Sequence, residues 1–210
     1  MVIVIQLSFV GMLFVSCAYE YNVCSMTRIP MISDVIADSV FDRLFILLNT
    51  AYFFGVHQVN VRALHARFHG IISPKTNTVL LFAGLASSFS LPLIGMFDNR
   101  SFLISHFFFA GVFFTSAAFY LSYTALLMHR HKAALSGRHW RKSEDALRIE
   151  RKIDFNFWYS HLCTSTVSGT AVCLIVYGDK HSLTALFEWV CVFAYMTLTM
   201  LIMSTIPCSD

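Results

Sequence analysis

Two ionisable side chains lie inside long apolar runs and are the best candidates for chemistry in this chain. Glu188 is the only acidic residue well inside such a run, 182–206, and His106 lies near the start of another, 102–128. An ionisable group at bilayer depth costs on the order of 2–3 kcal/mol, so it normally faces a bundle interior or an aqueous cavity and has a partner. A Glu–His pair at matched depth predicts a general acid/base or a polar head-group site. The same pair could instead hold helices together, and the sequence leaves both interpretations open.

Charged residues in the connections next to these runs would form the rim of such a site: Asp34, Asp38, Asp42, Arg43 and Asp98. The three aspartates of the first connection are spaced by four residues, which predicts one face of a short helix with Ser33 as its N-cap. This face is either a solvated surface or an acidic rim beside the site. His57 and His161 lie nearer the opposite end of their runs, and we expect them to be interfacial or to hydrogen-bond between helices.

The elements that must position these residues are apolar runs long enough to cross a membrane. Of the 210 residues, 57% are hydrophobic and 13% are charged, about half of the charged share that is typical of soluble domains. A hydrocarbon core of about 30 Å takes roughly 17–25 helical residues. Six runs meet this length: 2–19, 43–61, 78–96, 102–128, 156–177 and 182–206. We therefore predict an all-α polytopic membrane protein, in which residues 1–210 form a single domain of six transmembrane helices. Since the first run starts at the first residue, we expect a minimal first span or a shortened isoform.

The basic residues predict how these spans are oriented. Eight of the fifteen Lys and Arg residues lie between residues 129 and 152. With six spans, this connection, the connection 62–77 and both termini share one side, which carries eleven basic residues against four on the other. The positive-inside bias then places both termini in the cytosol and the candidate site in the lumen or outside the cell. Beside membrane spans, the basic stretch is better explained as a cytosolic loop, with a charged surface helix at 142–152, than as a nucleic-acid patch.

Other patterns that carry chemistry are missing from the sequence. The six cysteines form no C-x-x-C pair and only Cys24 lies clearly in a connection, so we expect neither a metal site nor an intramolecular disulfide. No Walker, Rossmann, zinc-protease or nucleophile-elbow motif is present, and we expect no cofactor. A transporter or channel has little support, because no inverted repeat is evident and intramembrane charges are few.

Several short motifs resemble those of one family of six-span membrane proteins. They are Asn-Val-Cys at 22–24, Arg-Ile-Pro-Met-Ile-Ser at 28–33, His106, and Ala-Leu-Phe-Glu-Trp at 185–189. Over essentially its whole length the chain resembles the post-GPI-attachment factor two family. That family lies within the FRAG/DRAM-type superfamily, together with the DRAM autophagy modulators and the N-terminal domain of yeast cell-wall biogenesis proteins that exchange GPI lipids. The resemblance implies the same six-span fold.

The resemblance also implies a function at the luminal leaflet. It implies a Golgi membrane protein, with the endoplasmic reticulum as the alternative membrane, that takes part in fatty-acid remodelling of GPI anchors, where a lyso-GPI regains a saturated chain. Its partners would be membrane lipid and GPI-anchored proteins, with His106 and Glu188 as the polar pair and the aspartate face contacting the glycan or partner proteins. The resemblance leaves open whether the chain is itself the catalyst. The alternative is a DRAM-like, non-enzymatic membrane modulator or scaffold.

Overall fold

The computed structural model describes residues 2–19, 24, 29–37, 39–136, 144–178 and 182–205. Its longer helices are α1 (Val2–Ala18), α3 (Ser39–Tyr52), α4 (Gln58–Phe68), α5 (Pro74–Met96), α6 (Leu103–Arg130), α8 (Glu144–Tyr177) and α9 (Ser182–Ser204). The shorter elements are α2 (Ile32–Val35), the π-helix η1 (Phe53–His57) and α7 (Lys132–Leu135). The described residues contain no strand, which confirms the prediction of an all-α protein.

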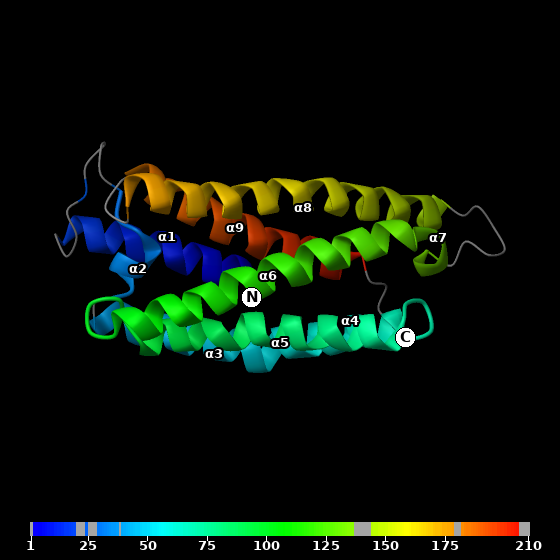
Figure 1. Ribbon diagram of the computed structural model, residues 1–210, viewed down its shortest axis with the longest axis horizontal. Helices are drawn as coiled ribbons and strands as arrows, with labels where there is room; N and C mark the ends of the chain where they lie inside the picture. Colours follow the sequence, from blue (N-terminus) through cyan, green and yellow to red (C-terminus); the bar gives the residue numbers. More distant parts are fainter. Residues whose placement is uncertain are drawn as a thin grey trace.

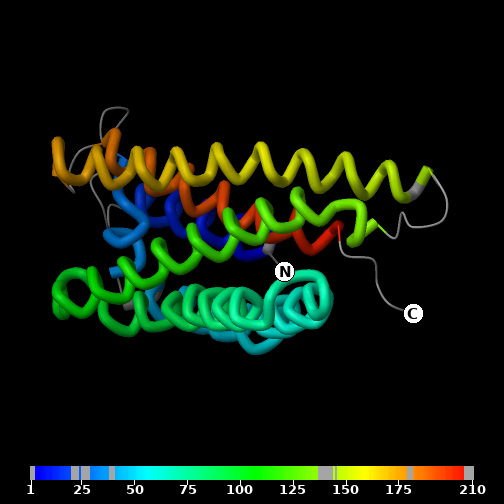
Figure 2. Tube along the Cα trace, turned by 45° about the vertical axis from the view of Figure 1, so that its right-hand side comes forward, coloured from blue at the N-terminus to red at the C-terminus, as the bar shows by residue number. Residues whose placement is uncertain are grey.

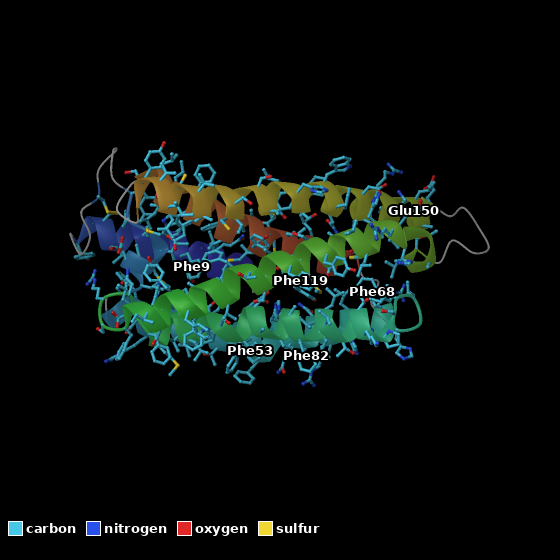
Figure 3. The ribbon with its side chains drawn as sticks, in the orientation of Figure 1. Phe9, Phe53, Phe68, Phe82, Phe119 and Glu150 are labelled. Carbon is cyan, nitrogen blue, oxygen red and sulfur yellow. A yellow bond between two sulfur atoms is a disulfide. The ribbon has the colours of Figure 1, made fainter. Side chains whose placement is uncertain are left out.

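The helices have the length and the apolar outer surface of a membrane protein. Five stretches are long and apolar enough to cross a membrane: Phe41–Phe68, Pro74–Met96, Leu103–Arg130, Ala146–Tyr177 and Ser182–Ser204. The sixth, α1, is a shorter apolar helix of 17 residues. Phe82 is exposed on the outer surface, whereas Phe9 and Phe68 are buried inside the bundle (Figure 3). These findings confirm the prediction of a polytopic membrane protein, and the side on which each end lies stays a prediction.

The helices form an elongated bundle with their axes roughly along its length (Figure 1). α5 packs against α3, α4 and α6, while α8 packs against α6 and α9, and α1 contacts α9 and α3. Figure 2 shows α1 starting part way along the bundle. It runs towards the end that holds α2 and the α5–α6 connection, residues 97–102, which we call the site end. The opposite end holds α7 and the α4–α5 connection, residues 69–73, and we call it the basic end.

Two predicted helix boundaries are wrong, both at the basic end. The second span does not stop at residue 61, because α3, η1 and α4 continue without interruption to Phe68. The charged segment 142–152 is not a separate surface helix, because from Glu144 onwards it is the first part of α8. Glu, Lys and Arg are good helix formers, so a helix can continue beyond the hydrocarbon core into the head-group layer. Hydropathy marks where the bilayer core ends, whereas α4 and α8 extend beyond that boundary as helix.

The expectation of no intramolecular disulfide is also wrong. Cys17, in the last turn of α1, is bonded to Cys24, with the two Cα atoms 5.4 Å apart. Cys17 lies in an apolar run, but the last turn of α1 places it next to Cys24, seven residues further along the chain. Disulfides persist in oxidising compartments such as the endoplasmic-reticulum lumen. The bond therefore supports a luminal or external position for the site end.

The helix predicted for the first connection is much shorter than the aspartate spacing indicates. α2 covers four residues, and Met31 rather than Ser33 occupies its N-cap position. Ile32, Val35 and Ile36 are buried in the bundle core. Burial of these three apolar side chains, rather than a continuous acidic face, determines how this segment folds.

Candidate functional site

Glu188 lies on the side of α9 that faces the bundle interior, with only 8% of its surface exposed. Its Oε2 accepts a hydrogen bond of 2.9 Å from the backbone N–H of Ile32, the first residue of α2. The first N–H groups of a helix have no acceptor within that helix, and a buried helix start needs one from elsewhere. Glu188 supplies this acceptor from a position 156 residues further along the chain.

Trp189 makes a second connection between α9 and the same segment. Its Nε1–H donates a hydrogen bond of 2.9 Å to the backbone carbonyl of Pro30. Buried Trp side chains normally find such an acceptor. We call Glu188, Trp189, Pro30 and Ile32 the loop clamp, since two adjacent residues of α9 hold both ends of one three-residue segment. The clamp joins two of the short motifs, 28–33 and 185–189, into one structural unit.

His106 is buried near the start of α6, where it is 3% exposed. Its Nδ1 lies 2.9 Å from the carbonyl oxygen of Phe97 and 3.3 Å from that of Ile94. Carbonyl oxygens only accept hydrogen bonds, so Nδ1 carries a proton, and in the neutral form of the ring the lone pair is on Nε2. The side chain thereby caps the last carbonyl groups of α5 and has a defined tautomer.

His106 and Glu188 line the same small cavity but do not hydrogen-bond to each other in the described structure. The cavity has a volume of about 40 Å³ and is otherwise lined mainly by apolar side chains of α1, α2, α3, α5, α6 and α9. A water molecule occupies about 30 Å³ in the liquid, so a cavity of this size holds one or two waters rather than an acyl chain. Because His106 and Glu188 line the same cavity, they lie at the same depth in the bundle. Each has its own backbone hydrogen-bond partner.

Two of the predicted rim residues, Asp34 and Asp98, form hydrogen bonds at the site end. Asp34 Oδ1 accepts a bond of 3.2 Å from Asn99 Nδ2, which joins α2 to the α5–α6 connection. Asp98 Oδ1 accepts bonds from the backbone N–H groups of Arg100 (2.9 Å) and Ser101 (2.8 Å). Partial burial of Asp98 would raise the pKa of its carboxyl, but the hydrogen bonds from Ser101 and Arg100 outweigh it and hold this pKa below its ordinary value. Asp98 is therefore an ionised turn residue.

The other rim residues are not gathered at the cavity. Asp42 and Arg43 lie on α3, where Arg43 is exposed and Asp42 is half-buried. Asp42 Oδ1 is enclosed without a hydrogen-bond partner among the described residues. Asp38 lies outside the described residues. None of the four described rim residues, Asp34, Asp42, Arg43 and Asp98, lines the cavity that His106 and Glu188 share.

A second polar cluster lies deeper in the bundle and was not predicted as a site. His57 Nε2 lies 3.1 Å from the carbonyl oxygen of Gly84, and Tyr52 Oη lies 3.1 Å from His57 Nδ1. His57 therefore donates a hydrogen bond from Nε2 to the Gly84 carbonyl and accepts one at Nδ1 from the Tyr52 hydroxyl. Ser87 Oγ also donates to the Gly84 carbonyl, at 2.8 Å. We call these four residues the mid-bundle network, and it confirms the expected inter-helix hydrogen bond of His57.

The π-helix η1 explains how Tyr52 and His57 meet. In an α-helix the residues at i and i+5 do not face each other, whereas one π-helical turn, as in Phe53–His57, rotates the chain enough to align them. The spacing of Tyr52 and His57 was visible in the sequence, but its meaning depends on a local change of helix type. Among the described residues, no three His, Cys, Asp or Glu side chains lie close enough together to hold a metal ion.

Over nearly its whole length the chain matches the model of a known protein family. The model of the Frag1/DRAM/Sfk1/Cwh43P N-terminal domain matches residues 1–205 of the chain. The match includes the loop clamp and His106. No curated protein and no solved structure matches the chain.

Proposed function

The chain belongs to the Frag1/DRAM/Sfk1/Cwh43P N-terminal domain family, and from this premise we propose that it takes part in fatty-acid remodelling of GPI anchors. The proposed step is the one at which a lyso-GPI regains an acyl chain, in the luminal leaflet of the Golgi or endoplasmic-reticulum membrane. Its partners in this proposal are membrane lipid and GPI-anchored proteins. Within this family, we propose that the chain is related to the post-GPI-attachment factor two proteins.

The observation that carries the proposal is the loop clamp beside the cavity of His106. The two motifs on which the resemblance rests, 28–33 and 185–189, meet through Glu188 and Trp189. His106, the third element of the resemblance, lines the same cavity as Glu188. All three lie at the end that the basic residues predict to be luminal, where GPI lipids reside.

The geometry of His106 suits a general base if the chain carries out the chemistry itself. Nδ1 is held by the Phe97 carbonyl, so the lone pair is on Nε2. A base at this position could accept the proton of a lyso-lipid hydroxyl while the oxygen forms a new ester bond with the carbonyl carbon of an acyl donor. The donor's own acyl bond then breaks, and its leaving group takes the proton back from the imidazole. Glu188 would keep the first loop in place beside it. The small volume of the cavity means that the acyl chains would lie outside it, in the surrounding lipid.

Deleting the gene tests the proposal directly. We expect fewer GPI-anchored proteins at the cell surface, and anchors that lack the saturated chain when their fatty acids are analysed by mass spectrometry. Re-expressing the wild-type chain should restore both. Unchanged surface levels together with unchanged anchor chains would exclude a part in this remodelling step.

A DRAM-like membrane modulator or scaffold is the second candidate. The observation in its favour is that Glu188 and His106 both have backbone partners and that their cavity is small, as expected of groups that only hold the bundle together. Localisation separates the two candidates. A tagged chain found in lysosomes and absent from the Golgi would favour the modulator.

A further inference from the structure

A large cavity lies at the basic end, far along the bundle from the loop clamp. It has a volume of about 580 Å³ and lies between the first turns of α8 and the last turn of α9. Three of its lining side chains are cationic, Arg148, Arg151 and Lys152, whereas Phe155 and Leu201 are apolar. Cavities that bind small molecules commonly measure roughly 300–1,000 Å³. Nothing in the proposed remodelling function uses this cavity.

Helix lengths place the cavity at the boundary of the hydrocarbon core. α8 has 34 residues and α9 has 23, and at about 1.5 Å per residue α8 is longer by about 16 Å. The two helices are joined at the site end, so this excess extends past Ser204 at the basic end (Figure 1). Lys152 Nζ lies 3.4 Å from the Ser204 carbonyl oxygen, which fixes the level at which α9 ends. The cationic side chains therefore lie at head-group depth.

The side chains just inside this level are those of a lipid-facing surface. Phe155 is exposed on α8, and Trp158, one turn further along the helix, is 68% exposed. Trp is enriched where hydrocarbon meets head groups. A lipid whose chains cover Phe155 and Trp158 would present its head group to the cavity.

The charges of the cavity are not neutralised within the described part of the chain. No carboxylate there lies within ion-pair distance of Arg148, Arg151 or Lys152, and Glu144 is the only acidic residue among the described lining residues. By contrast, Lys132 and His129 at the same end are both paired with Asp154. The described lining residues thus carry three positive charges and one negative charge, an excess of two.

We propose that the cavity formed by Arg148, Arg151 and Lys152 binds the phosphomonoester head group of an anionic phospholipid in the leaflet at the basic end, predicted to be cytosolic. A phosphomonoester carries roughly −1.5 to −2 charges at neutral pH, which matches the excess of two, whereas a phosphodiester carries only one. Two guanidinium groups offer planar, paired donors that suit phosphate oxygens. Basic cavities between transmembrane helices on the cytosolic side are a recognised arrangement for anionic lipid head groups.

Lipid binding to the purified full chain in neutral detergent tests this, with native mass spectrometry as the measurement. The probes are phosphatidic acid and phosphatidylmethanol with identical acyl chains, which differ in that one is a phosphomonoester and the other a diester. We expect phosphatidic acid to bind at least about tenfold more tightly. Comparable affinity for the two lipids would overturn the assignment to a phosphomonoester. If glycerol 3-phosphate displaced phosphatidic acid at equal concentration, the site would be one for soluble phosphates and the lipid proposal would be wrong.

The matched variants are R148Q/R151Q, inside the cavity, and R62Q/K75Q, which removes two exposed cations from the same end outside it. The first should weaken phosphatidic acid binding by about tenfold or more, and the second by less than about twofold. Equal losses in both would show diffuse attraction to the basic end and overturn the proposal, as would wild-type affinity in R148Q/R151Q. If R148Q/R151Q does not fold, R148K/R151K keeps the charge without the paired donors and should bind measurably more weakly than wild type. Unchanged binding by that variant would remove the role of the two guanidinium groups.

Discussion

Glu188 accepts a hydrogen bond that a neutral side chain of the same shape could also accept. In Glu188→Gln the amide oxygen can replace Oε2 as the acceptor for Ile32 N–H, so we expect a change in stability below about 1 kcal/mol. Glu188→Ala leaves a buried N–H without a partner, which costs about 1–3 kcal/mol. Thermal unfolding of the detergent-purified variants measures the difference. A Glu188→Gln variant as unstable as Glu188→Ala would mean that the charge, rather than the acceptor, holds the loop clamp.

The same Glu188→Gln variant also tests whether the charge of Glu188, and not only its shape, is needed for function. If the site binds a head group or reacts through ionised groups, Glu188→Gln should reach the same membrane at normal abundance and yet fail to restore anchor remodelling in deleted cells. His106→Gln should fail in the same way, because its amide can still donate to Phe97 but has no basic nitrogen. The double variant should be no worse than either single one, since groups that act as a unit are non-additive. Full rescue by Glu188→Gln at normal abundance would show that the carboxylate charge is not needed.

The lowered pKa of Asp98 predicts that the stability of the fold decreases at acidic pH. Because its folded pKa lies below the ordinary value of about 3.9, its ionised form stabilises the fold above that pH, and this contribution is lost as the pH falls through the folded pKa. Asp98→Asn removes this titration while it keeps an oxygen acceptor for Arg100 and Ser101. We expect the melting temperature of the wild type to fall more steeply below about pH 4 than that of the variant. If the melting temperatures of the two proteins fell equally with pH, ionised Asp98 would not be the group that stabilises the fold.

At the scale of helices, Gly84 allows α5 to approach its neighbours closely. A Cβ atom at Gly84 would lie 2.9 Å from Tyr120 Cε2 and 2.9 Å from Val61 Cγ1, and both side chains are buried. Neither a buried ring nor a β-branched side chain moves easily, so we expect Gly84→Ala to cost about 1–3 kcal/mol of stability. Thermal unfolding in detergent measures this loss.

Gly111, on α6, provides the matched control, because a Cβ atom added there would have no neighbouring atom within 4 Å. Gly111→Ala should be neutral or stabilising by up to about 1 kcal/mol, since Ala favours the helix. The same loss for both variants would mean that close packing is not the cause. In Gly84→Ala we also expect a weaker hydrogen bond between His57 and the carbonyl of residue 84, because the mid-bundle network depends on the close spacing of these helices.

At the scale of the whole molecule, the Cys17–Cys24 bond and the basic residues predict the same orientation. Arg100→Cys, at the site end, should be protected from a thiol reagent in cells permeabilised only at the plasma membrane, and should react once internal membranes are opened. Ala134→Cys, on α7 at the basic end, should react at once. Without reduction, Cys17 and Cys24 should stay unlabelled in both conditions because they are bonded to each other. Equal protection of Arg100→Cys and Ala134→Cys would overturn the orientation.

The amino-acid sequence alone determined the class of this protein and the depth of its ionisable groups. Each apolar run long enough to cross a bilayer must satisfy its backbone hydrogen bonds within itself, so hydropathy over some twenty residues predicts a helix without reference to the rest of the chain. This local rule also placed His106 and Glu188 near the same end. The rule has no information on the helix type at Phe53–His57 or on the continuation of α8 into its charged start.

The tertiary structure decided which partners these groups have. The hydrogen bond from Ile32 to Glu188 spans 156 positions, and that from Trp189 to Pro30 spans 159. No local pattern encodes such contacts, because they depend on which helices are neighbours and on how each is rotated about its axis. For the same reason the sequence indicated a His–Glu pair where the structure has two separately held groups around one cavity. Only the packing of α8 against a shorter α9 brought Arg148, Arg151 and Lys152 together around the basic cavity, since it depends on where each helix ends relative to its neighbour.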